Sequence, residues 1–309
     1  MDNKRDGAAY IAFFVVSIVW GTTYYALKVG VETFPPFLFS AIRQILAGGI
    51  LLVILRIMGA LKYDKNILFT QLILGTLMIA LGNGVIGWSE QYIPSGLAAL
   101  IVSILPFYVV VINYLSGIER LKPNKHLIKG LGLGAVGIAL IFRDNLKDFA
   151  NPNYFLGMLF AFGACLSWAA GSVYTKQKAK KGNVMTNVAF QMLFGGVILG
   201  IMSLFLDDYN ELHKVNISSM WALGYLILIG SVITYPCYIY ALENLPIGLV
   251  STYTYINPFV ALILGYFLLN ERITTVTVIA FAFVMAAIYY IHKSNKAQND
   301  ILKLNRKKV

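Results

Sequence analysis

The amino-acid sequence contains the same apolar stretch twice, and this duplication restricts the possible folds more than any other feature. Residues 94–120 read PSGLAALIVSILPFYVVVINYLSGIER, and residues 246–272 read PIGLVSTYTYINPFVALILGYFLLNER. Six landmarks keep a constant displacement of 152 residues: Pro94 and Pro246, Gly96 and Gly248, Pro106 and Pro258, Tyr114 and Tyr266, Glu119 and Glu271, and Arg120 and Arg272. Agreement at so many positions indicates an internal duplication.

A second pairing lies upstream of each copy. Three residues recur there, with the tryptophan and the lysine displaced by 148 residues: Trp20, Gly21 and Lys28 correspond to Trp168, Gly171 and Lys176. The change from 148 to 152 requires four extra residues, which are placed most simply in the polar stretch 207–219. We therefore predict two repeats, residues 1–150 and residues 151–309, the second ending in a basic tail.

The composition is that of a membrane protein. The chain is 58% hydrophobic and 13% charged, with a mean hydropathy of +0.71, whereas soluble domains are roughly 45–50% apolar and about 25% charged. Apolar windows long enough to cross a bilayer occur at ten places: 8–28, 36–56, 67–88, 95–116, 127–143, 154–175, 187–206, 220–241, 247–269 and 274–292. We expect an all-α integral membrane protein of ten transmembrane helices. Five spans per repeat is an odd number, so the two repeats must insert in opposite orientations, as inverted repeats.

The positive charge is distributed by side of the membrane. The net charge is +11, but the basic residues alternate with the connections and do not line one surface, which argues against a nucleic-acid partner. On the predicted topology, 19 of the 25 lysines and arginines lie on the side of the amino terminus. By the positive-inside rule, both termini are predicted to be cytoplasmic, in the cell inner (plasma) membrane. We then expect the chain to lie in the lipid bilayer and its basic tail to contact anionic lipid headgroups.

The sequence offers no catalytic constellation. The three histidines lie far apart at span ends, without an acidic pair or a metal-ligand spacing beside them, and both cysteines, Cys165 and Cys237, fall inside apolar spans. The glycines of GLGAVG at 132–137 match a dinucleotide-binding spacing, but no strand precedes them. Gly130 and Gly134 are instead expected to form a small-residue surface for close helix contact. We therefore expect no enzyme activity, no metal and no cofactor.

Two helix faces carry the repeated tryptophans. Trp20, Tyr24 and Lys28 lie four residues apart and share one face of a helix, as do Trp168, Ser172 and Lys176 in the second half. A tryptophan near the middle of a span is out of place for the interfacial aromatic belt, so this face is predicted to point inward. Helix packing and the lining of a cavity are both open interpretations.

Polar side chains interrupt two further spans. Arg43 lies well inside the second span, and its repeat counterpart is the uncharged Gln191; such an arginine either snorkels to the outer surface or contacts an anionic group. Asn83 interrupts the third span, and Trp88 follows it in the same span. At the displacement of 152 residues, the counterpart of Asn83 is Tyr235. Asn83 either bonds to a neighbouring helix or faces substrate.

Pro106 and Pro258 stand inside the fourth and ninth spans, where each removes a helical hydrogen bond and frees a carbonyl. We expect a hinge or kink at both positions. Broken backbone at membrane depth is tolerated where it is buried in protein or lines a cavity, and Ser103, Tyr255 and Asn257 lie at the same level. A kink that serves packing alone remains the other interpretation.

Together these residues resemble the drug/metabolite transporter superfamily, in its EamA branch. The resemblance rests on the paired Trp-Gly starts with a downstream lysine, the mid-span prolines and the repeated Pro-x11-Pro-x12-Glu-Arg string, and it covers residues 8–292. It implies a ten-helix basket whose central cavity is lined by spans 1, 3, 4, 6, 8 and 9, and an activity of exporting or exchanging small metabolites such as amino acids or drugs. The second half departs from the pattern, because Ala169 and Ala170 separate Trp168 from Gly171.

The expected activity is therefore efflux by alternating access, with a small-molecule substrate that is aromatic or amphipathic. The candidate substrate-binding residues are Trp20, Tyr24, Arg43, Asn83, Trp88, Ser103, Trp168, Ser172, Tyr235, Tyr255 and Asn257. No carboxylate lies at mid-span, which favours facilitated diffusion or exchange over obligatory proton antiport. A proton-coupled antiporter, with Glu90 and Glu243 as its first candidate carboxylates, and a channel-like pore are the alternatives.

Overall fold

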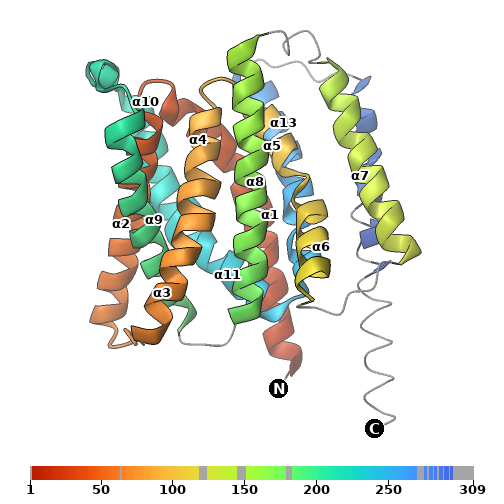
Figure 1. Ribbon diagram of the computed structural model, residues 1–309, viewed down its shortest axis with the longest axis horizontal. Coiled ribbons are helices and arrows are strands. Elements are labelled where there is room, and N and C mark those ends of the chain that lie inside the picture. Colours follow the sequence, from red (N-terminus) through yellow and green to blue (C-terminus); the bar gives the residue numbers. More distant parts are fainter. Residues whose placement is uncertain are drawn as a thin grey trace.

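The computed structural model describes residues 2–62, 65–117, 124–144, 151–178, 183–269, 275–276, 278–280, 282–283, 285–287, 289–291 and 293–294. Within these ranges the chain is helical and contains no strand (Figure 1). The α-helices are α1 (Asp2–Val31), α2 (Pro36–Ile57), α3 (Lys65–Leu74), α4 (Val85–Ser89), α5 (Ser95–Val102), α6 (Leu105–Ser116), α7 (Lys125–Asp144), α8 (Pro152–Lys178), α9 (Val184–Leu206), α10 (Ile217–Tyr225), α11 (Thr234–Asn244), α12 (Ile247–Val250) and α13 (Tyr253–Leu269). A 3-10 helix, η3 (Tyr209–Lys214), and two π-helical segments, η1 (Gly75–Gly84) and η4 (Leu226–Ile233), complete the set.

Eight helical stretches of the described chain are long and apolar enough to cross a membrane. They are Gly7–Val31, Pro36–Ile57, Ile67–Ser89, Ser95–Ser116, Pro152–Lys178, Val184–Leu206, Ile217–Asn244 and Ile247–Leu268. Each matches one of the ten expected windows. Of the remaining two windows, 127–143 is covered by α7, and 274–292 contains the shorter apolar helix Val278–Ile291.

Side chains and prolines fix where the helices begin. Pro36 lies in the first turn of α2, and Pro152 is the first residue of α8, positions where a missing N–H costs nothing. Asn183 caps α9 by accepting hydrogen bonds from the amides of Met185 and Thr186, and Asn216 likewise accepts from the amide of Ser219 at the start of α10.

The start of α2 is also tied to the end of α9. The carboxylate of Asp207, which follows α9, accepts hydrogen bonds from the amides of Phe37 (3.3 Å) and Leu38 (2.8 Å). A carboxylate at this position satisfies two of the unpaired N–H groups of a helix N-terminus. The two predicted repeats are thus connected at this end of the α2–α9 pair.

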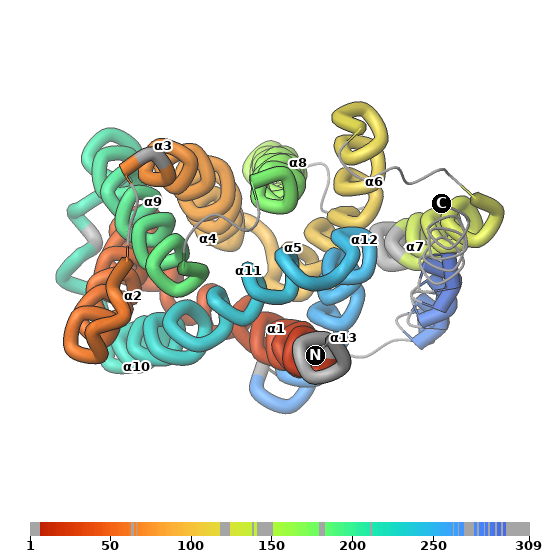
Figure 2. The backbone as a smooth tube through the Cα atoms, turned by 90° about the horizontal axis from the view of Figure 1, so that it is seen from below, coloured from red at the N-terminus to blue at the C-terminus, as the bar shows by residue number. Residues whose placement is uncertain are grey.

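Two small residues allow α2 and α9 to pack closely, side by side (Figure 2). A Cβ atom on Gly48 would lie 2.8 Å from the carbonyl oxygen of Ala189, and one on Gly196 would lie 2.8 Å from Cγ1 of Ile45. Small residues let helix backbones approach in a membrane, where packing replaces the hydrophobic drive. Gly48 and Gly196 are themselves displaced by 148 residues, so equivalent positions make the crossing.

Both proline-containing spans are interrupted, but the interruptions precede the prolines. α5 ends at Val102 and α6 begins at Leu105, with Pro106 in its first turn; α12 ends at Val250 and α13 begins at Tyr253, with Pro258 inside it. A proline fits the first turn of a helix and disturbs the residues before it, which accounts for a break upstream of Pro106. The hinge expected at each proline is therefore displaced toward the amino terminus.

One helix pair lies at the edge of the bundle. α7 packs against residues near the end of the described chain, because Gly130 meets Ile291 and the carbonyl of Ala287 (Figures 1 and 2). Leu127, Tyr255, Ala287 and Ile291 form a small hydrophobic cluster there, separate from the main core. Gly130 and Gly134 thus lie at close helix contacts, as their spacing predicted, whereas a Cβ on Gly132 would meet nothing within 4 Å. The pairs Glu119–Arg120 and Glu271–Arg272 lie outside the described residues.

Candidate functional site

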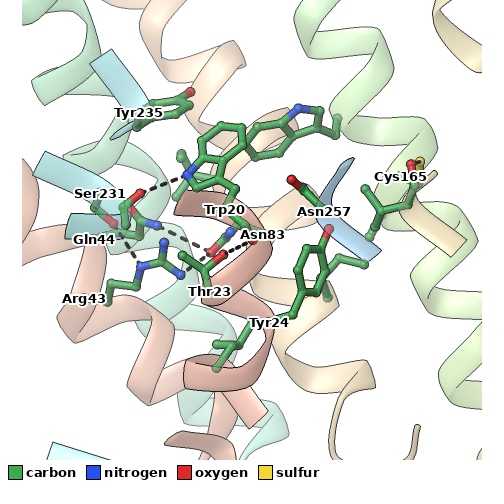
Figure 3. A pocket seen from close by; sticks show the side chains of 18 of the residues that line it. Trp20, Thr23, Tyr24, Arg43, Gln44, Asn83, Cys165, Ser231, Tyr235 and Asn257 are labelled. Atoms are coloured by element: carbon green, nitrogen blue, oxygen red, sulfur yellow. Dashed lines mark hydrogen bonds between the residues drawn. The ribbon is translucent and has the colours of Figure 1, made fainter. Parts of the chain in front are cut away.

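A central pocket lies between the two predicted repeats (Figure 3). It contains about 690 Å³ of space not filled by protein atoms, the open solvent at its mouth included. Its walls come from α1, α2, η1, α4, α5, α8, η4, α11 and α13. The lining residues are Trp20, Thr23, Tyr24, Leu27, Arg43, Gln44, Ile79, Gly82, Asn83, Ile86, Val102, Ala164, Cys165, Trp168, Gly230, Ser231, Tyr235, Tyr253 and Asn257.

Seven of the residues singled out from sequence line this pocket: Trp20, Tyr24, Arg43, Asn83, Trp168, Tyr235 and Asn257. They come from both halves of the chain. Tyr24 and Asn257 point toward each other, and Arg43 and Asn83 lie on the opposite side of Trp20 (Figure 3). The pocket therefore has a polar end around the guanidinium and an aromatic wall.

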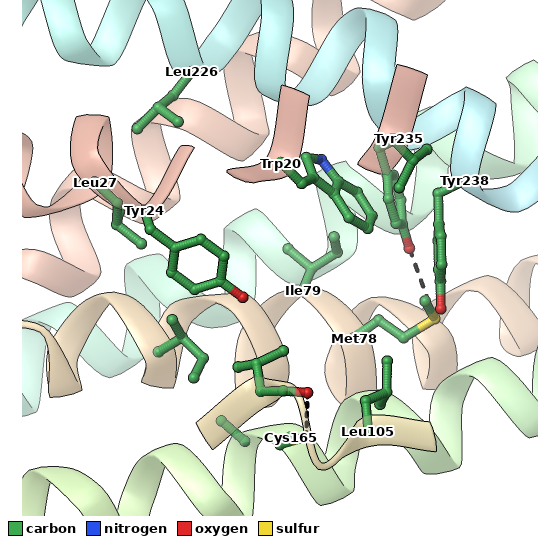
Figure 4. Packing of buried hydrophobic residues seen from close by; sticks show 14 of the residues in the cluster. Trp20, Tyr24, Leu27, Met78, Ile79, Leu105, Cys165, Leu226, Tyr235 and Tyr238 are labelled. Atoms are coloured by element: carbon green, nitrogen blue, oxygen red, sulfur yellow. Dashed lines mark hydrogen bonds between the residues drawn. The ribbon is translucent and has the colours of Figure 1, made fainter. Parts of the chain in front are cut away.

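Trp20 is the centre of the aromatic wall (Figure 4). Its ring meets that of Trp168 edge to face with a centroid separation of 5.4 Å, and lies 4.9 Å from Tyr238 and 5.1 Å from Tyr253. The indole Nε1 donates to the carbonyl oxygen of Gly230 at 3.1 Å. Packed rings with their polar atoms satisfied form a rigid apolar surface against which a flat solute can stack.

Arg43 supplies the positive charge of the pocket. The side chain is only 3% exposed, so it does not snorkel to the surface. Its Nε donates to Oγ of Ser231 at 2.9 Å, and Nη1 donates to Oδ1 of Asn83 at 3.2 Å. A guanidinium has five N–H donors. The acceptors of these two hydrogen bonds, the Ser231 hydroxyl and the Asn83 amide oxygen, are both neutral. The charge is therefore held in place without a bound carboxylate.

The partners of Arg43 lie on or next to non-α backbone. Asn83 belongs to the π-helical segment η1, and Ser231 belongs to the π-helical segment η4. A shift of 152 residues places η1 over most of η4, so the two predicted repeats carry the π-helical irregularity at the same place. π-helical turns inside α-helices occur frequently at functional sites, because they reposition side chains and leave backbone groups available.

The carbonyls that the two prolines release are taken by other side chains. A proline at 258 cannot donate to the carbonyl of Thr254, and Ser103 Oγ donates to it instead at 2.8 Å. Similarly, Cys165 Sγ donates to the carbonyl of Val102, four residues before Pro106, at 3.6 Å. These carbonyls are therefore used within the protein, and the kinked backbone does not present them to the pocket.

Four residues singled out from sequence do not line the pocket. Trp88 lies against Tyr92 and Phe160, and Ser103 is engaged at the helix break. Ser172 shares a hydrogen bond of 2.7 Å with the hydroxyl of Tyr238, behind the aromatic wall. Tyr255 faces α7, with its hydroxyl 2.9 Å from where a Cβ on Gly134 would lie.

The rotation of the helices explains these outcomes. Tyr255 lies two residues before Asn257 and so on the other side of α13, whereas Tyr253 lies one full turn before Asn257 and shares its face. Helical spacing applied to Asn257 would therefore have selected Tyr253. By the same spacing Thr23 follows Trp20 into the pocket. Gln44 and Ser231 carried no comparable signal in the sequence.

Two equivalent lysines bind backbone at helix ends. Lys28 Nζ donates to the carbonyls of Glu90 and Ile93, where α4 ends, and Lys176 Nζ donates to those of Leu242 (2.9 Å) and Leu245 (2.7 Å), where α11 ends. The acceptors are displaced by 152 residues and the donors by 148. A cation at a helix C-terminus compensates the unpaired carbonyls and the helix dipole.

The side chain of Glu90 is buried at the end of a span. Glu90 follows the apolar span Ile67–Ser89, as the sequence indicated, but its carboxylate is fully buried. Neither carboxylate oxygen accepts a hydrogen bond from the described protein. The expectation of transport without a coupled proton rested on the absence of a carboxylate at mid-span. Glu90 lies just beyond the span, so that expectation stays a prediction, but a buried carboxyl group is present at the end of the span.

The comparisons with known proteins agree with this architecture. A model of the EamA-like transporter family matches residues 7–143 and again residues 155–292. The uncharacterized inner membrane transporter YedA of Escherichia coli K12 is 32% identical over 281 residues, which is 91% of this chain and 89% of that protein. The uncharacterized transporter YoaV of Bacillus subtilis is 28% identical, with 84% of this chain and 88% of that protein covered.

Two further matches have lower sequence identity, one to a named relative and one to a solved structure. A probable amino-acid metabolite efflux pump of Escherichia coli K12 is 24% identical, with 93% of this chain and 94% of that protein covered. A protein of known crystal structure superposes with a TM-score of 0.73 at 18% identity, covering 94% of this chain and 99% of that one. At that identity the likeness shows a shared fold.

Proposed function

This chain belongs to the EamA-like transporter family, as its sequence resemblance predicted, and we propose that it exports or exchanges small metabolites by alternating access through the central pocket. The family and the named relatives are transporters and not enzymes. The observation that carries the proposal is the position of the pocket, which contains the equivalent tryptophans Trp20 and Trp168.

The proposed architecture is two inverted repeats of five helices each, residues 1–150 and 151–309, with ten spans in all. Contacts between equivalent residues support it. Trp20 and Trp168 touch each other, and residues that a two-fold axis exchanges can touch only where they straddle that axis. Gly48 and Gly196 form the α2–α9 crossing. An axis in the membrane plane places the substrate site between the repeats, near the middle of the bilayer.

The proposed substrates are aromatic or amphipathic solutes that carry a carboxylate, amino acids among them. The aromatic wall around Trp20 suits a ring or an apolar chain. The guanidinium of Arg43 suits a carboxylate, because arginine can bind both oxygens of such a group. The name of one relative, a probable amino-acid metabolite efflux pump, favours the same class.

The two helix breaks are the proposed hinges of the transport cycle. The breaks before Leu105 and before Tyr253 lie beside the pocket, since Val102 and Tyr253 both line it. Short helical pieces joined by two non-helical residues can change their relative angle at little cost. We propose that rotation at these breaks opens the pocket to the two sides in turn.

The relative YedA is named as an inner membrane transporter, and we propose the same membrane for this chain, with both termini cytoplasmic.

The test is solute counterflow in proteoliposomes. Vesicles containing the purified chain are loaded with an unlabelled amino acid and diluted into a trace of the labelled one, with phenylalanine, tryptophan, leucine and lysine as the panel. Saturable uptake that is stimulated by the internal solute is the expected result for phenylalanine and tryptophan. Flux that neither saturates nor responds to the internal solute would favour a channel-like pore and contradict alternating access.

A further inference from the structure

Glu90 is a buried carboxyl group without a hydrogen-bond donor. It follows the last residue of α4, its side chain is 0% exposed, and neither oxygen has a partner in the described protein. Lys28, the basic side chain at this helix end, directs its Nζ to the backbone carbonyls of Glu90 and Ile93. The lysine thus caps the helix and leaves the carboxyl group without a hydrogen bond.

The second repeat has the same lysine contact but a different carboxyl environment. Lys176 binds the carbonyls of Leu242 and Leu245, and Glu243 lies beside them, only partly buried. The residue equivalent to Glu90 is thus Leu242, and the neighbouring Glu243 is only half-buried, so a fully buried carboxyl group is present at the first of these two helix ends and not at the second. In the proposed alternating access, one repeat rocks against the other and the two sides open in turn, so a conformation in which water reaches Glu90 is expected in the same cycle.

The surrounding charges do not pair with Glu90. The helices packed against α4 are α1, α2 and α8, together with η1. α1 contributes Lys28 and Tyr24, and α2 contributes Arg43, all coupled to Glu90 through space. η1 carries no ionisable side chain; the ionisable groups of α8 are Tyr154, Cys165 and Tyr174, with Lys176 and Lys178 in its last turn.

Chemistry favours the neutral acid in this environment. An ionised carboxylate needs water or several hydrogen bonds, and its removal from both is expensive. Burial accordingly raises the pKa of Glu90 well above its usual value, while the positive charges of Lys28 and Arg43 oppose the shift. The carboxyl group lies just beyond an apolar span, so a modest opening of this helix end would bring water to it.

We propose that Glu90 is a proton-binding site, occupied while this helix end is closed and emptied when the end opens. On opening, the O–H bond of the carboxyl group breaks, the proton passes to water, and the carboxylate remains beside Lys28. Because the closed conformation binds the proton more tightly, acid favours closure and alkali favours opening. The conformational part of this proposal rests on the proposed alternating access, whereas the protonation itself does not.

Infrared difference spectra of the purified chain in lipid nanodiscs test the protonation. The wild type is expected to keep the carbonyl stretch of a protonated carboxylic acid well above pH 4.3, about where an ordinary glutamate titrates. Glu90→Gln should abolish that band, and the matched variant Glu243→Gln should keep it. Glu90→Asp retains an acid and should keep a shifted band, which guards against a folding defect in Glu90→Gln. A band that is absent from the wild type, or unchanged in Glu90→Gln, overturns the proposal.

Hydrogen exchange tests the coupled opening. After correction for the intrinsic effect of pH, amides at 89–95 should exchange several-fold faster at alkaline pH in the wild type but not in Glu90→Gln, with 241–247 as the internal reference. An identical pH response in the variant would show that opening is independent of Glu90 and would overturn the coupling. No substrate is needed, so a failed flux assay beside a positive infrared result would reject the proposed transport and keep the proton site.

Discussion

Lys28 and Lys176 lie 148 residues apart in the sequence and make the same contact, each binding two backbone carbonyls at the end of a helix. The first caps α4 and the second caps α11. In a transporter with inverted repeats, these two ends would lie on opposite sides of the membrane and would have to open alternately. On the proposed alternating access, the lysines mark the two closures, and the pocket lined by Trp20 and Trp168 lies between the proposed repeats.

Replacing Arg43 tests the proposed carboxylate site. Arg43→Gln introduces the residue that occupies the equivalent position, Gln191, so the helix is expected to tolerate it. A hydrogen bond to a charged group contributes about 1.5–3 kcal/mol, so the KM for a carboxylate-bearing substrate should rise about 10- to 150-fold. Counterflow at several substrate concentrations measures the change.

The control for that substitution is Arg56→Gln, at the exposed end of α2. It removes the same charge far from the pocket and should leave the KM unchanged. An unaltered KM in a well-expressed Arg43→Gln protein would show that the guanidinium does not bind the substrate. An equal loss in both variants would indicate a general effect of net charge.

The sequence predicted much of this site because its signals are periodic. The duplication, the apolar spans and the inward face of Trp20 follow from spacing alone, and seven candidate residues do meet around the pocket. The angular position of a residue around its helix was predicted less well than its depth in the membrane. Tyr255 was placed by its level in the membrane, whereas its angle around α13 carries it to α7, and Tyr253 occupies the place by the pocket.

Burial at the span ends could not be read from the sequence. Hydropathy places Glu90 and Glu243 at comparable depth, yet only Glu90 is fully buried. The difference arises from how far each helix end is covered by its neighbours, a property of tertiary packing. The π-helical segments were hidden for a similar reason, because apolar residues of η1 and η4 fit an α-helical pattern equally well.

The proline inside α13 is expected to affect transport more than insertion. Pro258→Ala restores an N–H that competes with Ser103 for the carbonyl of Thr254. An added helical hydrogen bond stabilises this conformation by about 0.5–1.5 kcal/mol, which slows departure from it by up to about tenfold. The exchange rate of reconstituted protein measures the effect, with Pro152→Ala at the start of α8 as the control. Wild-type exchange in Pro258→Ala would mean that the broken helix does not limit transport.

Two adjacent glycines give a stability test of the α2–α9 crossing. Gly48→Ala places a Cβ 2.8 Å from the carbonyl of Ala189, whereas Gly49→Ala meets nothing within 4 Å. Overpacking costs about 1–3 kcal/mol, so the first variant should lower the midpoint of thermal unfolding. The second should hold or raise it, since alanine favours a helix over glycine by about 1 kcal/mol. Equal midpoints would argue against close contact at Gly48.

The orientation in the membrane can be decided with reporter fusions. The excess of lysine and arginine beside the amino terminus predicts that both termini are cytoplasmic. Ten spans would then place Val309 in the cytoplasm and Asp208, beyond the end of α9, on the opposite side. Alkaline phosphatase, active only outside the cytoplasm, should be active when fused after Asp208 and inactive after Val309, and green fluorescent protein should give the reverse. Phosphatase activity after Val309 would require an odd number of spans and would exclude two five-helix repeats, whereas inactivity at both sites would place α9 and α10 in a different topology.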